Sequence, residues 1–416
     1  MKVSESEFTS ERFRTLTHGN RGSQVIQWTL VAQATSLVVF VLLASYWDFP
    51  LTEALSFPVA DGWCDVRNEG VSSHCFGDFG YQLANARRAD PWASGLNPYP
   101  PSVQMVFDWF RALADLLGYN QSFALYVGTL LLATGVATGL LARSASRAGM
   151  SGVTIVPCVL LGWGFISALD RGNNVLWLLP MTVIVMRHDN TRTRTFWWCV
   201  LALALLKPQF MILGALLGLV RFICLLVTFL GMQLASTAWL MGASGAVRGM
   251  RSWVSAVLAN DEYPIGLGQN MSLRGPLSLF TSAPVGFALA AVFMLVALVQ
   301  ARPDPSDSEI PTVVVGLGLV TSVMTPTVVF PYYSVVFQFV VLSLIVGPAA
   351  RRKYRLSQRF SLVALFVLSS VTLIDPGSNR HLSVALVPLA SLAVIILSLA
   401  AWIKDSRVWE HKGTAA

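Results

Sequence analysis

Charged residues within apolar sequence are the first candidates for chemistry. Lys207 lies between the apolar runs 196–206 and 209–220, and Asp170 and Arg171 precede another apolar run. A charge at the depth of a membrane is costly and usually has a function, because hydrocarbon does not solvate it. Both cations suit an anionic phosphate, which needs fixed positive partners in a low-dielectric cavity. The alternative is a buried ion pair, of Asp170 with Arg171 or of Lys207 with a carboxylate, that only fixes helix packing.

Asp78 is the carboxylate whose setting best suits catalysis. It lies among aromatic residues between Gly77 and Gly80, where flexible backbone can hold a partly buried carboxylate over a cavity. The other reading is an ordinary solvated or helix-capping aspartate. Tyr332 and Tyr333 also have two readings: an aromatic belt at a membrane interface, or a surface that stacks on a sugar.

The composition indicates which elements must hold these residues. The 416 residues are 54% hydrophobic and 12% charged, which leaves too little polar surface for a water-soluble fold of this size. Runs of about 20 apolar residues suit helices that cross a bilayer, and they lack the alternation of barrel strands. We therefore expect an all-α polytopic membrane protein with about 12 transmembrane helices. The expected spans are 26–47, 122–142, 152–169, 174–186, 196–206, 209–220, 222–242, 280–300, 310–325, 332–349, 360–374 and 382–402.

Basic residues set the expected orientation. With the N-terminus in the cytoplasm, basic clusters beside span ends, such as Arg143 with Arg147 and the cluster 351–355, fall on one side of the membrane, as the positive-inside rule requires. The net charge of +7 thus reflects topology, and we expect no nucleic acid partner. This topology makes 196–206 and 209–220 a hairpin. The turn between them lies below the outer surface, where irregular backbone needs a protein-lined or wet cavity.

The chain then has three parts: a cytoplasmic segment 1–25, a transmembrane domain 26–402 and a cytoplasmic tail 403–416. The first apolar run is too long for the core of a signal peptide, so we interpret it as a retained signal anchor. Two long segments face outward, a large first extracytoplasmic loop 48–121 and a second segment 243–279. The stretch 103–117 of the first loop is amphipathic, which suits a helix on the membrane surface.

Two cysteines suit a disulfide. Cys64 and Cys75 both lie in the first loop, and because an extracytoplasmic loop permits disulfides, we expect these two cysteines to be bridged. The other cysteines lie in apolar runs, where they suit packing. The sequence contains no metal-type cluster of cysteine and histidine residues, so we expect no bound metal.

Short motifs along the chain occur in the order of a known family. An outer-loop aspartate is followed by Tyr81, and the further motifs are residues 97–101, 171–173, 206–209 and 270–275. Together they resemble glycosyltransferase family 87, a GT-C-type family of actinobacterial membrane mannosyl- and arabinofuranosyltransferases. The likeness covers about residues 26–350. Family members tend to carry a histidine near the segment that matches Thr325-Pro326, whereas the corresponding stretch here is residues 330–333, without histidine.

The resemblance implies a GT-C fold in the plasma membrane with its active site on the extracytoplasmic side. It implies transfer of mannose or arabinofuranose from a polyprenyl-phosphate donor to a hydroxyl of a cell-envelope glycolipid or glycan. We expect no cofactor. Asp78 would then be the general base, which takes the acceptor's proton in an inverting displacement. The donor phosphate would meet Lys207, Arg171 and Arg274, and the substrates would meet Tyr81, Asn97, Tyr99, Asn270, Tyr332 and Tyr333.

Two other functions fit the same residues. Broken helices with charged turns also serve secondary transporters at the middle of the membrane, so a transporter or flippase for a lipid-linked or small anionic solute is the main alternative. The large outer loop and the lack of a visible duplicated half argue against it. A noncatalytic membrane scaffold is the third interpretation, but Lys207 at membrane depth would then lower stability without serving a function.

Overall fold

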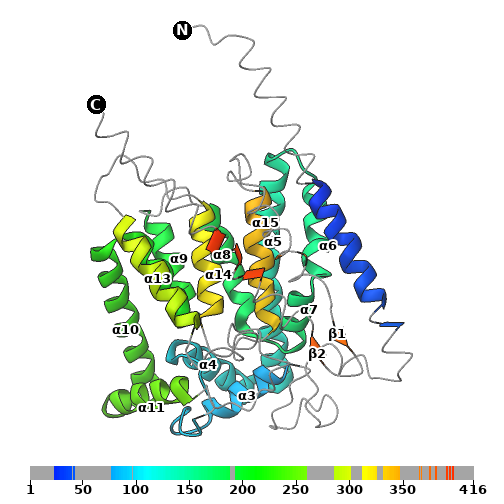
Figure 1. The fold of residues 1–416 in the computed structure, drawn as a ribbon. Coiled ribbons are helices and arrows are strands. Elements are labelled where there is room, and N and C mark those ends of the chain that lie inside the picture. The colour runs from blue at the N-terminus through cyan, green and yellow to red at the C-terminus, as the bar shows by residue number, and fades with distance from the viewer. Residues whose placement is uncertain are drawn as a thin grey trace, which may run out of the picture.

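The structure is a computed structural model. It describes residues 23–39, 41–42, 76–95, 97–187, 193–259, 285–300, 312–325 and 331–346, and isolated positions from 365 to 397. The described residues are mostly helical, beginning with the helical residues 23–39 (Figure 1). Two short strands, β1 (Ile374–Asp375) and β2 (Arg380–His381), pair antiparallel.

Two of the described helices are long and apolar enough to cross a membrane: α5 (Tyr119–Arg147) and α10 (Leu219–Met241). A third span results if a bent pair counts as one, in which η1 (Gly152–Thr154) and α6 (Ile155–Leu160) meet α7 (Trp163–Asp170) at 53°. All three lie where the sequence predicts spans. These helices support a helical membrane protein, and the expected total of about 12 crossings remains a prediction.

Shorter helices complete the described bundle. They are η2 (Asn174–Trp177), α8 (Leu178–Arg187), α9 (Arg194–Leu206), η3 (Pro208–Leu217), α13 (Val285–Gln300), α14 (Thr312–Met324), η8 (Pro331–Tyr333) and α15 (Ser334–Val346). Helix α9 has 13 residues and is about 20 Å long, less than the ~30 Å hydrocarbon core. Helix α15 is buried around its whole circumference and packs against α5, α7, α8 and α14, which places it inside the bundle. Gly164 allows α7 to approach it, because a Cβ there would overlap Ser334 and Val335.

The chain turns at Lys207, as the sequence predicts. Helix α9 ends there because Pro208 lacks an N–H and would clash with the preceding turn. Lys207 takes extended backbone angles (φ −147°, ψ 102°), and η3 packs against α9. Ser102 fixes the turn from outside, since its hydroxyl donates to the Leu205 carbonyl at 2.6 Å and its N–H donates to Gln233 Oε1 at 3.0 Å.

Charge differs between the two ends of the bundle. Helices α3 (Gly77–Ala86), α4 (Pro101–Leu117) and α11 (Ala246–Ala259) gather at one end (Figure 1). Helix α5 starts directly after α4 and runs away from this end. At its far end Arg143 and Arg147 lie close enough to Arg187, the last residue of α8, for their charges to interact. This basic end opposite α3 and α4 fits the positive-inside expectation.

The amphipathic helix α4 packs on α3 and α5 through Phe107 and Phe110. Both side chains are buried, and the Phe110 ring meets the rings of Phe79 and Tyr126 at centroid distances of 6.0 and 5.3 Å. Leu116 and Leu117, in the last turn, are exposed. The start of the apolar face thus holds the neighbouring helices, and a contact of its far end with the membrane surface stays a prediction.

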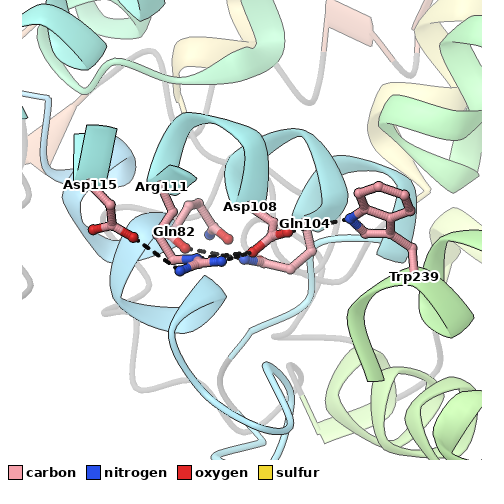
Figure 2. Close-up of polar contacts among 6 residues, drawn as sticks. All are labelled: Gln82, Gln104, Asp108, Arg111, Asp115 and Trp239. Carbon is pink, nitrogen blue, oxygen red and sulfur yellow. Dashed lines mark hydrogen bonds and ion pairs between the residues drawn. The ribbon is translucent and has the colours of Figure 1, made fainter. Parts of the chain in front are cut away.

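The opposite face of α4 is polar and is tied to α10. Arg111 makes ion pairs with Asp108 at 2.9 Å and Asp115 at 3.1 Å, and Trp239 of α10 donates from Nε1 to Asp108 at 3.4 Å (Figure 2). Partly exposed ion pairs of this kind contribute at most about 1 kcal/mol each. They help to orient α4 but lie apart from the candidate site.

Candidate functional site

Two backbone hydrogen bonds join the start of α3 to the turn after α7. The N–H of Phe76 donates to the Asp170 carbonyl at 2.6 Å, and that of Asp78 donates to the Arg171 carbonyl at 3.1 Å. Phe76 has a left-handed backbone (φ 63°), a conformation that non-glycine residues adopt rarely. The Tyr126 hydroxyl donates to the Gly172 carbonyl at 2.5 Å. These contacts bring two segments together that are far apart in the sequence.

Position 172 requires a glycine for two reasons, its backbone conformation and the closeness of Phe76. Its φ is +61°, and an added Cβ would lie 2.6 Å from Phe76 Cδ1 and 3.0 Å from Phe76 Cα. Gly172→Ala is expected to lower the free energy of unfolding by more than about 2 kcal/mol, because left-handed strain of about 1–2 kcal/mol adds to the overlap. Thermal unfolding in detergent measures this.

The matched control for that change is Gly149→Ala. Gly149 also has a positive φ (+78°), but an added Cβ there meets nothing within 4 Å. We expect only the conformational strain of about 1 kcal/mol. Equal losses for the two variants would show that the contact between Gly172 and Phe76 does not hold the site together.

Asp78 is the centre of the site. Its Oδ1 accepts a hydrogen bond from Arg171 Nη2 at 3.0 Å, and its Oδ2 accepts one from Asn173 Nδ2. The two side chains of the ion pair are only 14% (Asp78) and 12% (Arg171) exposed. Since a carboxylate offers about four lone-pair positions, these bonds leave acceptor capacity for another group. The carboxylate is thus held in place without being fully used.

Asn173 connects Asp78 to the next residue of the site. Its Nδ2 also lies 3.0 Å from Tyr99 Oη, and its Oδ1 accepts from the N–H of Val175 at 2.9 Å, which caps η2. The amide orientation is therefore fixed from both sides. The sequence motif 171–173 contained this asparagine, but no separate role was assigned to it; its position before an apolar helix was the available signal.

Lys207 is a buried cation beside the same tyrosine. Its side chain is 8% exposed, and Nζ lies 4.2 Å from the centroid of the Tyr99 ring and 5.5 Å from that of Tyr333. The ion pairs among the described residues do not include Lys207. Aromatic faces stabilise an ammonium group only partly. Within the described part of the chain, this lysine therefore lacks a negative partner, which a bound anion would supply.

The second cation of the site, Arg171, also lies over a tyrosine ring. Arg171 Cζ lies 5.5 Å from the centroid of the Tyr332 ring. The rings of Tyr332 and Tyr333 stack with centroids 5.1 Å apart and planes inclined by 30°. Both tyrosines are buried. The two stacked rings thus connect Arg171 to Lys207, so the four side chains form one cluster with Asp78.

Tyr99 is fixed by the loop that carries it. Asn97 donates to the Pro91 carbonyl at 3.2 Å and to Gln104 Oε1 at 3.1 Å, and it accepts from the Tyr99 N–H at 3.3 Å. Trp92 Nε1 donates to the Tyr99 carbonyl at 2.9 Å. Burial raises the pKa of the Tyr99 phenol, and the negative charge of Asp78 raises it further. The phenol therefore stays protonated at neutral pH.

The predicted site residues fall into three groups. The structure brings together Asp78, Arg171, Tyr99, Lys207, Tyr332 and Tyr333. Asn97 is buried and its amide is used within the loop, so its contact with substrate stays a prediction, and Tyr81 lies one turn beyond Asp78 on α3. Outside the described residues are Arg274, Asn270, Cys64 and Cys75.

The site offers one carboxylate, two cations, one amide and three phenols. Within the described ranges, no group of three or more histidine, cysteine, aspartate or glutamate side chains is placed to hold a metal ion. Such a donor set suits an anion next to a group that loses a proton.

No family model matches the chain, and no curated protein or solved structure is similar to it.

Proposed function

We propose that this chain is a multi-pass membrane glycosyltransferase that moves mannose or arabinofuranose from a polyprenyl-phosphate donor to a hydroxyl of a cell-envelope glycolipid or glycan. The observation that carries the proposal is the buried ammonium of Lys207, which lacks a carboxylate partner among the described ion pairs and lies over Tyr99. The Tyr99 hydroxyl is in turn 3.0 Å from the asparagine that holds Asp78. The candidate anion site at Lys207 and the candidate base Asp78 are therefore separated by only two side chains, those of Tyr99 and Asn173.

These positions support an inverting transfer from a sugar phosphate. The phosphate of the donor binds at Lys207, with Arg171 as the second cation. Asp78 accepts the proton of the acceptor hydroxyl while that oxygen attacks the anomeric carbon, and the bond from this carbon to the phosphate oxygen breaks with inversion. Lys207 stabilises the charge that develops on the departing polyprenyl phosphate, where a fixed cation in a low-dielectric site contributes most.

The resemblance to glycosyltransferase family 87 supports the same proposal. The full proposal is a GT-C fold with about 12 spans in the plasma membrane, with the active site on the extracytoplasmic side and without a cofactor. Asp78 lies on α3, which gathers with α4 at one end of the bundle (Figure 1), whereas Arg147 and Arg187 lie in the last turns of α5 and α8. Under the positive-inside rule this arrangement supports an extracytoplasmic position for the cluster.

Labelling of single cysteines tests the orientation. Ala93 is exposed near the site and Ser146 is exposed near the basic end of α5. In intact cells we expect a membrane-impermeant maleimide to label Ala93→Cys, and to label Ser146→Cys only after permeabilisation. The parent protein with Cys64, Cys75 and Cys224 replaced by serine serves as background, because Cys224 is exposed and the other two lie in the expected outer loop. Labelling with the reverse pattern would contradict an extracytoplasmic site.

One feature favours the transporter or flippase instead. Helices α6 and α7 meet at 53°, and broken helices of this kind line transport sites. Proteoliposomes that contain the purified protein distinguish the two functions. A transferase releases polyprenyl phosphate from a polyprenyl-phosphate sugar when acceptor is added, whereas a transporter moves the solute across the membrane and leaves the sugar on its phosphate.

A further inference from the structure

Asp78 belongs to a polar stripe on α3. Gln82 and Asn85 follow it at four and seven residues, a spacing that puts all three side chains on one face of a helix. Both amides are buried, with 0% of Gln82 and 1% of Asn85 exposed. We call Asp78, Gln82 and Asn85 the α3 stripe. The neighbouring face, with Phe79 and Leu83, is apolar and buried.

Among the residues that the structure describes, the two amides of the α3 stripe have no hydrogen-bond partners. Both polar atoms of Gln82 and both of Asn85 are shielded from solvent and make no hydrogen bond. Gln104 contacts Gln82 but does not use its side-chain amide: Gln104 Nε2 donates to the Gln82 backbone carbonyl at 3.1 Å, and Gln104 Oε1 accepts from Asn97 (Figure 2 shows Gln82 and Gln104). Buried amides in folded proteins almost always have partners, because an unpaired one is unfavourable.

From this we infer that the α3 stripe is the binding site for the carbohydrate acceptor. The inference rests on the proposed function, in which Asp78 must touch the acceptor hydroxyl. The residues beside it on the same helix face are then the ones that the rest of the acceptor meets. The donor phosphate is assigned to Lys207, which reaches Asp78 through Tyr99 and Asn173.

The chemistry of the stripe fits carbohydrate. An amide offers one acceptor oxygen and a two-proton donor, and neighbouring sugar hydroxyls both donate and accept. Seven residues of helix extend about 10 Å, which is longer than one sugar ring, so the acceptor is expected to be an oligosaccharide or a glycosylated lipid. Because both amides are shielded from solvent, binding requires local opening beside α3.

The test replaces each amide by an apolar side chain of similar size, Gln82→Leu and Asn85→Leu. The full chain in lipid nanodiscs is titrated with a mannose trisaccharide and with an arabinofuranose trisaccharide. We expect wild type to bind one of them and each variant to bind it about tenfold or more weakly, as the loss of a hydrogen-bonding amide predicts. The melting temperature should stay equal or rise, because an unpaired buried amide is removed.

Thr182→Val is the matched control. Thr182 on α8 is also fully buried and its hydroxyl has no partner, but it lies outside the α3 stripe. This variant should keep the wild-type affinity for trisaccharide. The inference is overturned if Gln82→Leu and Asn85→Leu bind within twofold of wild type, or if wild type binds neither trisaccharide.

The proposed function can fail separately. Sugar transfer with an unchanged acceptor KM in both stripe variants would overturn the α3 stripe and leave the transferase standing. Trisaccharide binding that depends on the stripe, without any consumption of donor, would support carbohydrate binding at the α3 stripe and exclude the glycosyltransferase activity.

Discussion

Asp78→Asn is expected to lower the rate of sugar transfer by about 10²–10⁴-fold, the range that is typical for loss of a general base. The amide keeps the shape of the carboxylate but no longer accepts a proton. In the wild type, Arg171 lies 3.0 Å from the Asp78 carboxylate. The amide oxygen of the variant still accepts a hydrogen bond from Arg171, although the ion pair is lost. The protein should therefore remain folded with a lower melting temperature.

Donor binding should not weaken in the same variant. Removal of the negative charge of Asp78 takes away repulsion toward a phosphate and leaves Arg171 available to it. The apparent donor constant is thus expected to stay equal or fall. Initial rates against donor concentration measure both effects.

Asp108→Asn is the matched control for this experiment. Asp108 is also paired with an arginine, at 2.9 Å from Arg111, but on the outer face of α4. Loss of such a partly exposed pair changes stability by at most about 1 kcal/mol and should leave turnover unchanged. If Asp78→Asn turns over within a few-fold of wild type, Asp78 is not the base.

Lys207→Met is expected to weaken donor binding by about 2–5 kcal/mol, which corresponds to roughly 30-fold or more in the apparent donor constant. Methionine fills the space next to Tyr99 without a charge, so the donor phosphate loses a partner that is only 8% exposed. The maximal rate should fall as well, because the same cation stabilises the departing phosphate.

Lys207→Arg and Arg111→Met complete this comparison. Lys207→Arg keeps the positive charge and should recover part of the donor affinity. Arg111→Met removes a cation from the surface of α4, outside the site (Figure 2), and should leave the donor constant unchanged. A donor constant for Lys207→Met equal to that of wild type would exclude this lysine from the phosphate site.

The sequence predicted the turn at Lys207 and the positions of the long helices for clear physical reasons. Proline ends α9 because it cannot donate to the helix, and long apolar runs mark α5 and α10 wherever they pack. The cation at the turn was therefore recognisable as a site residue. Its aromatic neighbours were not assigned to it, because Tyr99 and Tyr333 lie far from it in the sequence.

The partner of Arg171 could not be predicted from spacing. Asp170 is adjacent in sequence and was the partner considered, whereas the structure pairs Arg171 with Asp78. That pair depends on the backbone bonds between residues 76–78 and 170–171 and on the left-handed Phe76. Neither leaves a periodic signal in the sequence, since a left-handed non-glycine residue is specified by its tertiary contacts.

Asn97 has a structural use that its motif did not indicate. The side chain is buried and makes three hydrogen bonds that fix the Tyr99 loop. Its contact with substrate, which the motif suggested, stays a prediction. The stripe residues Gln82 and Asn85 were missed because buried amides without partners are visible only once the packing is known.

The most direct test is the release of polyprenyl phosphate from polyprenyl-phosphate mannose and polyprenyl-phosphate arabinofuranose by the purified protein in proteoliposomes. Wild type, Asp78→Asn and Lys207→Met are compared with an oligosaccharide acceptor present. We expect wild type to release polyprenyl phosphate from one donor and the sugar to appear on the acceptor, and we expect both variants to lose most of this rate. Intact donors in every sample, with acceptor unchanged while the wild-type liposomes take up solute, would contradict the glycosyltransferase.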